Sequence, residues 1–151
     1  MLTQALLAYA HFLAILTMVV FLSSEAALCR QEWLNAAVVR RLVTVDRIVS
    51  VAAVAVLLTG VARATWGDKG ASWYWHQPLL HLKLSLYVLG AVFAFKPRQA
   101  FRRWQRELDA KGVFPGEAEI KATRRSVMIQ AHILAVVPLV AAFLARGAWA
   151  H

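Results

Sequence analysis

Residues 5–22 read ALLAYAHFLAILTMVVFL and contain no Asp, Glu, Lys or Arg. An α-helix needs about 17–25 mostly apolar residues to cross the hydrocarbon core of a membrane. Three further apolar runs follow, at residues 48–62, 79–95 and 127–145. Because polar residues border each run, the helices are expected to extend beyond the runs themselves. The pattern predicts an all-α, four-transmembrane-helix bundle, with spans near residues 5–27, 42–63, 76–95 and 124–146.

The composition is that of a membrane protein. Of the 151 residues, 60% are hydrophobic and 17% are charged, whereas soluble domains have about 45–50% and about 25%. A chain this short suits one domain, residues 1–151, and it cannot bury so much apolar surface in water. A soluble enzyme, a disordered tail and a disulfide scaffold are therefore disfavoured, and Cys29 has no second cysteine to pair with. Residues 1–4, MLTQ, lack the basic segment of a signal peptide, so the first run is interpreted as a permanent span.

The basic residues are divided unequally among the loops. Of the 17 Lys and Arg residues, four lie between the first two spans, nine lie between the last two, and two lie between the second and third. Cytoplasmic loops of membrane proteins carry an excess of Lys and Arg. We therefore expect a bacterial inner-membrane protein with both termini in the periplasm. The excess of Lys and Arg in the cytoplasmic loops accounts for most of the net charge of +9. Nucleic acid is therefore not an expected partner.

The segment between the last two spans has a pattern of its own. Apolar residues recur there at helical spacing among four arginines, and Pro97 suits a first helical turn. The apolar residues are Phe101, Trp104 and Leu108, and the arginines are Arg98, Arg102, Arg103 and Arg106. This pattern predicts a basic amphipathic cytoplasmic helix lying on anionic lipid. A surface for docking a partner is the alternative interpretation.

Polar residues inside a span are costly unless they have a partner or a role. In the first span Gln4, His11, Met18 and Glu25 follow one another at intervals of seven residues. Seven residues are nearly two helical turns, so these residues share one stripe, which is expected to face the bundle interior. For His11 the alternatives are a ligand or proton-handling role and a hydrogen bond between helices.

The next two spans also open with polar residues. Asp46 and Ser50 share a face of the second span, while Arg47 either extends to the cytoplasmic surface or has a function. In the third span His81 and Lys83 are two residues apart, so they point about 200° apart around the helix. His81 is expected to turn inward, and Lys83 is expected to extend to the outer surface or to an anionic group.

His11 and His81 are expected at similar depths in the outer half of the bundle. With the first residue outside, His11 lies about 14 Å from that surface and His81 about 9 Å, at 1.5 Å per residue. Neutral imidazoles on facing helices are axial ligands of b-type haem. Lys83 would pair with a haem propionate. The chain has no CxxCH motif, so the haem would be held non-covalently.

These residues resemble a known group of membrane proteins. His11, the Asp46-Arg47 pair and His81-Leu82-Lys83-Leu84 look like the motifs of HemJ-type protoporphyrinogen oxidases and of CopD-like copper-resistance membrane proteins. In length and layout the chain is most similar to an uncharacterised bacterial family of short, four-helix predicted membrane proteins related to both. The resemblance implies a b-type haem held by His11 and His81, and membrane-bound redox chemistry.

The sequence thus predicts an inner-membrane haem b protein that exchanges electrons with a membrane or periplasmic partner. A homo-oligomer is the other expected assembly. Two histidine ligands would favour electron transfer, and one would leave an open site for oxidase chemistry. One alternative is copper handling, since His11, Met18 and Cys29 are suitable ligands. Another is a non-catalytic subunit of a membrane complex. Besides haem, the lipid bilayer is the expected partner.

Overall fold

The computed structural model describes residues 2–66 and 71–146, and the elements in these ranges are helices. In chain order they are α1 (Leu2–Leu28), the 3₁₀ helix η1 (Gln31–Trp33), α2 (Ala36–Trp66), α3 (Ala71–Trp75), α4 (Pro78–Lys111) and α5 (Glu117–Ala145). Of these described elements, α1, α2, α4 and α5 are long and apolar enough to cross a membrane. The chain is therefore all-helical in its described part, with four candidate spans.

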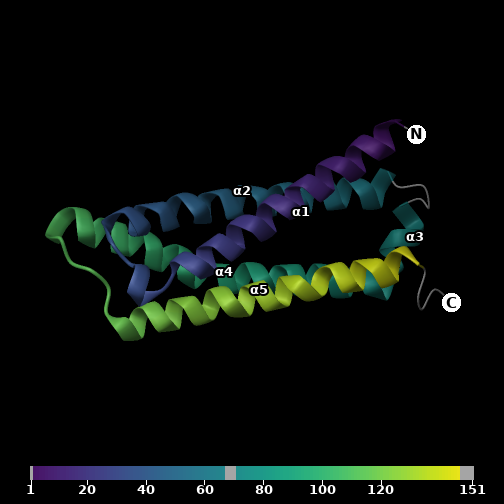
Figure 1. The fold of residues 1–151 in the computed structure, drawn as a ribbon. Coiled ribbons are helices and arrows are strands. Elements are labelled where there is room, and N and C mark those ends of the chain that lie inside the picture. Colours follow the sequence, from purple (N-terminus) through teal and green to yellow (C-terminus); the bar gives the residue numbers. More distant parts are fainter. Residues whose placement is uncertain (1, 67–70, 147–151) are drawn as a thin grey trace.

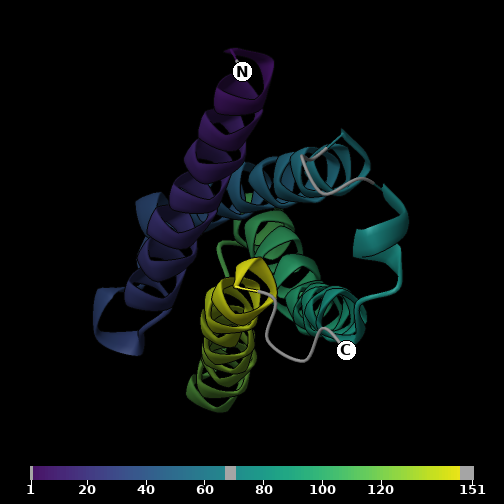
Figure 2. The same cartoon turned by 90° about the vertical axis from the view of Figure 1, so that its right-hand side faces the viewer.

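The four long helices form two antiparallel hairpins (Figure 1). Helix α1 packs mainly against α2, and α4 packs mainly against α5. At one end of the bundle α1 diverges from α5, as the view along the bundle shows (Figure 2). The beginning of α1 and the end of α5 lie at this same end (Figure 1), so the space between the two hairpins widens there.

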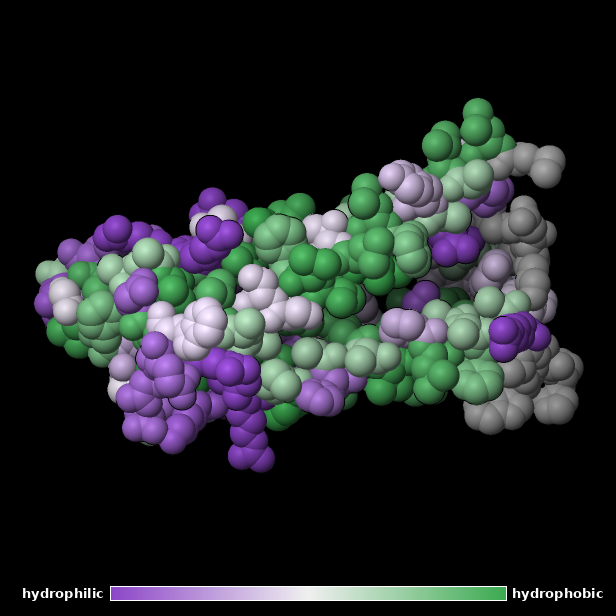
Figure 3. All heavy atoms as spheres, viewed as in Figure 1, coloured by the Kyte–Doolittle hydropathy of each residue, from purple (hydrophilic) through white to green (hydrophobic). Residues whose placement is uncertain are grey.

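A group of fully buried side chains lies toward the opposite end of the bundle. Phe101 and Trp104 of α4 are completely buried there, together with Leu42 of α2 and Val127 of α5. Large apolar side chains elsewhere face outward, including Val51, Val54, Leu58, Val88, Val92, Leu139 and Phe143. Apolar residues cover the middle of the surface in the space-filling view, and hydrophilic residues gather at the end away from the start of α1 (Figure 3). Lipid chains are the medium that suits this outer surface.

The segment after Pro97 differs from the expected surface helix. Helix α4 continues through Pro97 to Lys111 instead of restarting there. Phe101 and Trp104 are buried inside the protein, and Trp104 Nε1 donates a hydrogen bond to Glu119 Oε1 of α5 at 2.5 Å. Burial of the two aromatic rings and this hydrogen bond stabilise the packing of α4 in this region. The stretch is thus the end of a long helix whose apolar side packs against the protein.

Candidate functional site

A cavity of about 700 Å³ lies between the four long helices. Its lining comes from residues 8–19 of α1, 56–64 of α2, 80–87 of α4 and 134–142 of α5, with Trp75 from α3. These segments belong to the half of the bundle where α1 diverges from α5. In the space-filling view the molecule is hollowed between these two helices, with hydrophilic atoms deep in the hollow (Figure 3). Most lining residues are apolar, and the polar ones are His11, Arg63, Lys83 and Tyr87.

His11 lies at the inner side of this cavity. His11 is only 6% exposed. It belongs to the stripe of residues spaced by seven along α1, and the buried residues of this helix are His11, Met18, Leu22 and Glu25. The fourth stripe residue, Gln4, donates a hydrogen bond to the carbonyl of Trp66 on α2. The polar stripe therefore faces the interior of the bundle, as its spacing predicts.

The His11 side chain is held by a short hydrogen-bond chain. His11 Nδ1 lies 2.7 Å from Thr59 Oγ1 of α2, and Thr59 Oγ1 donates to the Ala55 carbonyl at 2.6 Å. Because a hydroxyl has only one proton to donate, Thr59 Oγ1 accepts a hydrogen bond from Nδ1–H of His11. This arrangement favours the tautomer in which Nε2 has a free lone pair, which is the form of histidine that binds a metal.

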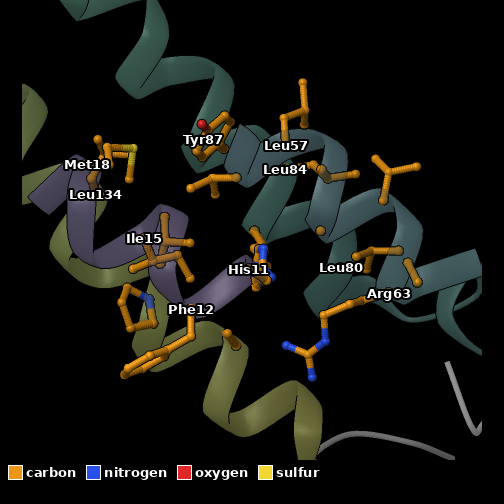
Figure 4. A pocket seen from close by; sticks show the side chains of 18 of the residues that line it. His11, Phe12, Ile15, Met18, Leu57, Arg63, Leu80, Leu84, Tyr87 and Leu134 are labelled. Carbon is orange, nitrogen blue, oxygen red and sulfur yellow. The ribbon is translucent and has the colours of Figure 1, made fainter. Parts of the chain in front are cut away.

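Gly60 allows helix α2 to approach the imidazole closely. A Cβ atom at this position would lie 3.2 Å from His11 Cε1, which is tighter than an ordinary van der Waals contact. The imidazole and the backbone of α2 therefore fit together because position 60 has no side chain. Figure 4 shows His11 against α2 among Phe12, Ile15 and Leu84, with Arg63 extending from α2 toward the same space.

Two cations from different helices line the cavity together with His11. Arg63 comes from α2 and Lys83 from α4. Within residues 2–66 and 71–146, neither side chain forms an ion pair, and the cavity lining contains no Asp or Glu. The two positive charges act on each other, so an anion placed between them would be attracted by both. The cavity is thus suited to an apolar ligand with anionic groups.

Lys83 and His81 lie on different sides of α4, as their spacing predicts, but the inward residue is Lys83. His81 is exposed, it does not line the cavity, and its Nε2 lies 3.0 Å from the Trp75 carbonyl. The structure therefore brings His11 and Lys83 to one cavity and leaves His81 outside it. The inward face follows the spacing of Leu80, Lys83, Leu84 and Tyr87, which is a helical i, i+3, i+4, i+7 pattern. That pattern is the signal in the sequence that identifies the inward face.

Arg63, Thr59 and Tyr87 are site residues that the sequence did not single out. Arg63 stands at the end of an apolar run, where a cation usually reaches the headgroups. Tyr87 donates its hydroxyl hydrogen bond to the Ala53 carbonyl, which links α4 to α2 beside the cavity. The spacing of Val56, Gly60 and Arg63 along one side of α2 is the only signal that points to this inner face.

The residues considered for copper are not brought together. Met18 lines the cavity, whereas Cys29 follows the far end of α1, about 27 Å from His11 along the helix at 1.5 Å per residue. Burial raises the pKa of the Cys29 thiol to about 12. Among the described residues no group of three or more His, Cys, Asp or Glu side chains is arranged to hold a metal ion.

The fold and the cavity define an integral membrane protein, a four-helix bundle with a cationic, mostly apolar cavity in one half. The chain belongs to the family described as "Predicted membrane protein (DUF2214)", which matches residues 3–148. No curated protein and no solved structure matches the chain. The family match confirms the likeness to a group of predicted membrane proteins, and the further likeness to HemJ-type and CopD-like proteins stays a prediction.

Proposed function

We propose that this protein binds haem b in the bacterial inner membrane, with the cavity as the haem site and His11 as the iron ligand. The observation that carries the proposal is the pairing of His11 Nδ1 with Thr59 at 2.7 Å inside the cavity. A metal-binding histidine usually donates its other N–H to a neighbouring group, which fixes the ring orientation and the tautomer. The same arrangement here leaves Nε2 available for iron.

The size and lining of the cavity support a ligand of this kind. Pockets for cofactors commonly have volumes of about 300–1,000 Å³ and are mostly apolar, with a few polar groups that set the orientation. The cavity has about 700 Å³ and fits this description. Haem b has a large apolar macrocycle and two propionate groups. Arg63 and Lys83 would pair with these propionates, which otherwise would be costly to bury.

In this proposal His11 is the one protein ligand to the iron. His81 lies on the exposed side of α4 and is hydrogen-bonded to the Trp75 carbonyl, so ligation by His81 would require that bond to break and the side chain to turn inward. When bound, haem supplies the redox chemistry, while the protein sets its ligation, burial and access. A single histidine ligand leaves an open position, which favours membrane redox chemistry on a small molecule over electron transfer alone.

The proposed topology places the cavity in the periplasmic half of the membrane. The basic residues near the opposite end of the bundle, among them Arg40, Arg41, Lys96, Arg102 and Arg106, would face the cytoplasm. A redox partner in the membrane or periplasm, or a second copy of the chain, would then contact the periplasmic end of the bundle, where α3 lies. Reporter fusions after Lys111 and at His151 test this orientation: an active cytoplasmic reporter at His151 would overturn it.

The absorption spectrum of the protein purified from haem-replete cells tests the cofactor. We expect non-covalent haem b in the wild-type protein and its loss or strong reduction in His11→Ala. His132→Ala is the matched control, because His132 is exposed on α5 and its Nδ1 lies 2.6 Å from the carbonyl of Met128 in its own helix. This control should retain the wild-type haem content. A colourless wild-type preparation would contradict the proposal and favour the non-catalytic subunit.

A further inference from the structure

A second buried polar group lies in the other half of the bundle. Arg98 of α4 donates from Nε to Asp46 Oδ2 of α2 at 3.3 Å, and from Nη2 to Ser50 Oγ at 2.5 Å. The Ser50 hydroxyl donates in turn to the Asp46 backbone carbonyl at 2.6 Å. The Asp46 side chain is 6% exposed and that of Arg98 is 32% exposed. These contacts join the two hairpins and give the charge of Asp46 a partner.

Glu25 of α1 is buried beside this network but does not share its hydrogen bonds. The residue is 2% exposed and is among the largest fully buried side chains of the protein. Within the part of the chain that the structure describes, its carboxyl group forms no ion pair and no hydrogen bond. Asp46 and Arg98 are the charged groups that act on it. An acid in this position needs a bound positive species to offset its burial.

A bound proton offsets the burial of the Glu25 carboxylate better than a bound metal ion would. Hard cations such as Ca²⁺ and Mg²⁺ require about six oxygen ligands, and the described residues contain no group of three or more acidic, histidine or cysteine side chains suited to a metal. The neighbouring carboxylate, Asp46, is already paired with the Arg98 guanidinium. A second cation next to that guanidinium would be repelled.

We propose that Glu25 is a proton-binding site inside the bundle, which holds its proton while Arg98 pairs with Asp46. On release, the carboxylic acid gives a carboxylate and a proton that passes to water, and Arg98 moves from Asp46 toward the new negative charge. The partial exposure of Arg98 leaves it room for this movement. The site is distinct from the cavity and does not depend on haem, although Glu25 and His11 lie on the same buried face of α1, about 21 Å apart along the helix.

Other charged and titratable groups surround the site. Arg102 of α4 acts on Asp46. Cys29, just after α1, keeps its thiol neutral, since burial is the main cause that raises its pKa. Arg124 of α5 acts on Cys29 and donates from Nε to the Ala26 carbonyl at 3.4 Å. Arg98 is therefore the cation best placed to respond when Glu25 ionises.

Infrared spectroscopy of the full-length protein in lipid nanodiscs tests the proposal directly. A neutral carboxylic acid gives a carbonyl stretching band that is separate from the bands of carboxylates and amides. We expect this band at neutral pH in the wild-type protein, and we expect it to shift in D₂O because the proton exchanges. It should vanish in Glu25→Gln and remain in Glu32→Gln, which removes an exposed acid from η1. Absence of the band in the wild-type protein, or its persistence in Glu25→Gln, would overturn the proposal.

Asp46→Asn supplies a second test that leaves Glu25 in place. Without Asp46, Arg98 is free to pair with Glu25, so Glu25 should ionise and its band should disappear. Persistence of the band in Asp46→Asn would overturn the role of Arg98. If Glu25→Gln fails to fold, Asp46→Asn and the D₂O shift of the wild-type band decide the matter. The wild-type band should also be the same in sodium chloride and choline chloride, and a loss in sodium would assign the site to a metal cation and overturn the proton.

Discussion

His11 Nδ1 of α1 lies 2.7 Å from Thr59 Oγ1 of α2, and this contact fixes the imidazole at the wall of the cavity. The contact is directional, because the Thr59 hydroxyl donates its own proton to the Ala55 carbonyl. Thr59 thus favours the tautomer of His11 that carries its proton on Nδ1. A histidine or a threonine on its own is ordinary for a membrane helix. Together, His11 and Thr59 leave the lone pair of His11 Nε2 unshared in a cationic, mostly apolar cavity.

Replacement of Thr59 should change the His11 tautomer. Thr59→Val keeps the side-chain shape but removes the acceptor, so the buried Nδ1–H loses a partner at a cost of about 1–3 kcal/mol. Loss of such a supporting contact typically weakens metal binding by about 10–100-fold. We expect weaker haem retention in Thr59→Val and near-normal retention in Thr59→Ser. The ¹⁵N chemical shifts of His11 report the tautomer even without haem: an unchanged tautomer in Thr59→Val would contradict the role of Thr59.

Gly60→Ala should displace the His11 ring. The added Cβ would lie 3.2 Å from His11 Cε1, so the imidazole or the backbone of α2 must move; such overpacking costs about 1–3 kcal/mol. We expect lower haem content and a lower melting temperature than in the wild-type protein. Gly116→Ala is the control, since a Cβ there meets no atom within 4 Å. Equal haem content in the two variants would show that His11 does not need the space at Gly60.

The sequence predicted the inward face of α1 but not that of α4. A seven-residue interval is close to two turns, so the stripe containing His11 and Glu25 could be assigned to one face without knowledge of the neighbours. On α4 the interval between His81 and Lys83 fixed only their angular separation. Which of them turns inward depends on how the helix is rotated against its neighbours, and the packing of Leu80 and Leu84 sets that rotation.

The role of Arg63 and the course of α4 depend on packing between helices in the same way. A cation at the end of an apolar run usually reaches the headgroups, and only the position of α2 beside α1 places Arg63 at the cavity. Pro97 suggested the start of a new helix, but α4 continues through it. Proline lacks one backbone hydrogen bond, and burial of Phe101 and Trp104 farther along the helix offsets that loss.

His81→Ala should leave haem binding intact. His81 is exposed, and its Nε2 is bonded to the Trp75 carbonyl outside the cavity. We expect the variant to keep the haem content and the spin state of the wild-type protein, in contrast to His11→Ala. Absorption and electron paramagnetic resonance spectra provide the comparison. A change from low spin to high spin in His81→Ala would instead identify His81 as a second iron ligand, and the helix would then have to rotate when haem binds.

Lys83→Met tests the cationic side of the cavity. The substitution removes the charge and nearly keeps the volume and the apolar stem of the side chain. A nearby cation disfavours the oxidised, more positive iron, so Lys83 should raise the reduction potential of the haem and its loss should lower it. A unit charge about 10 Å away contributes on the order of 1–2 kcal/mol at an effective dielectric constant of about 20, which is several tens of millivolts for a one-electron couple.

We therefore expect Lys83→Met to keep the ligation spectrum of the wild-type protein, with a lower midpoint potential in redox titrations and weaker haem retention. Arg63→Met should act in the same direction, because Arg63 lines the same cavity and forms no ion pair within the described residues. Arg47→Met is a matched control, since Arg47 is an exposed cation that does not line this cavity. If Lys83→Met and Arg47→Met both keep the wild-type potential and haem content, Lys83 serves only to reach the membrane surface. If Lys83→Met instead changes the spin state, Lys83 itself binds the iron, and the assignment of His11 as the one protein ligand is wrong.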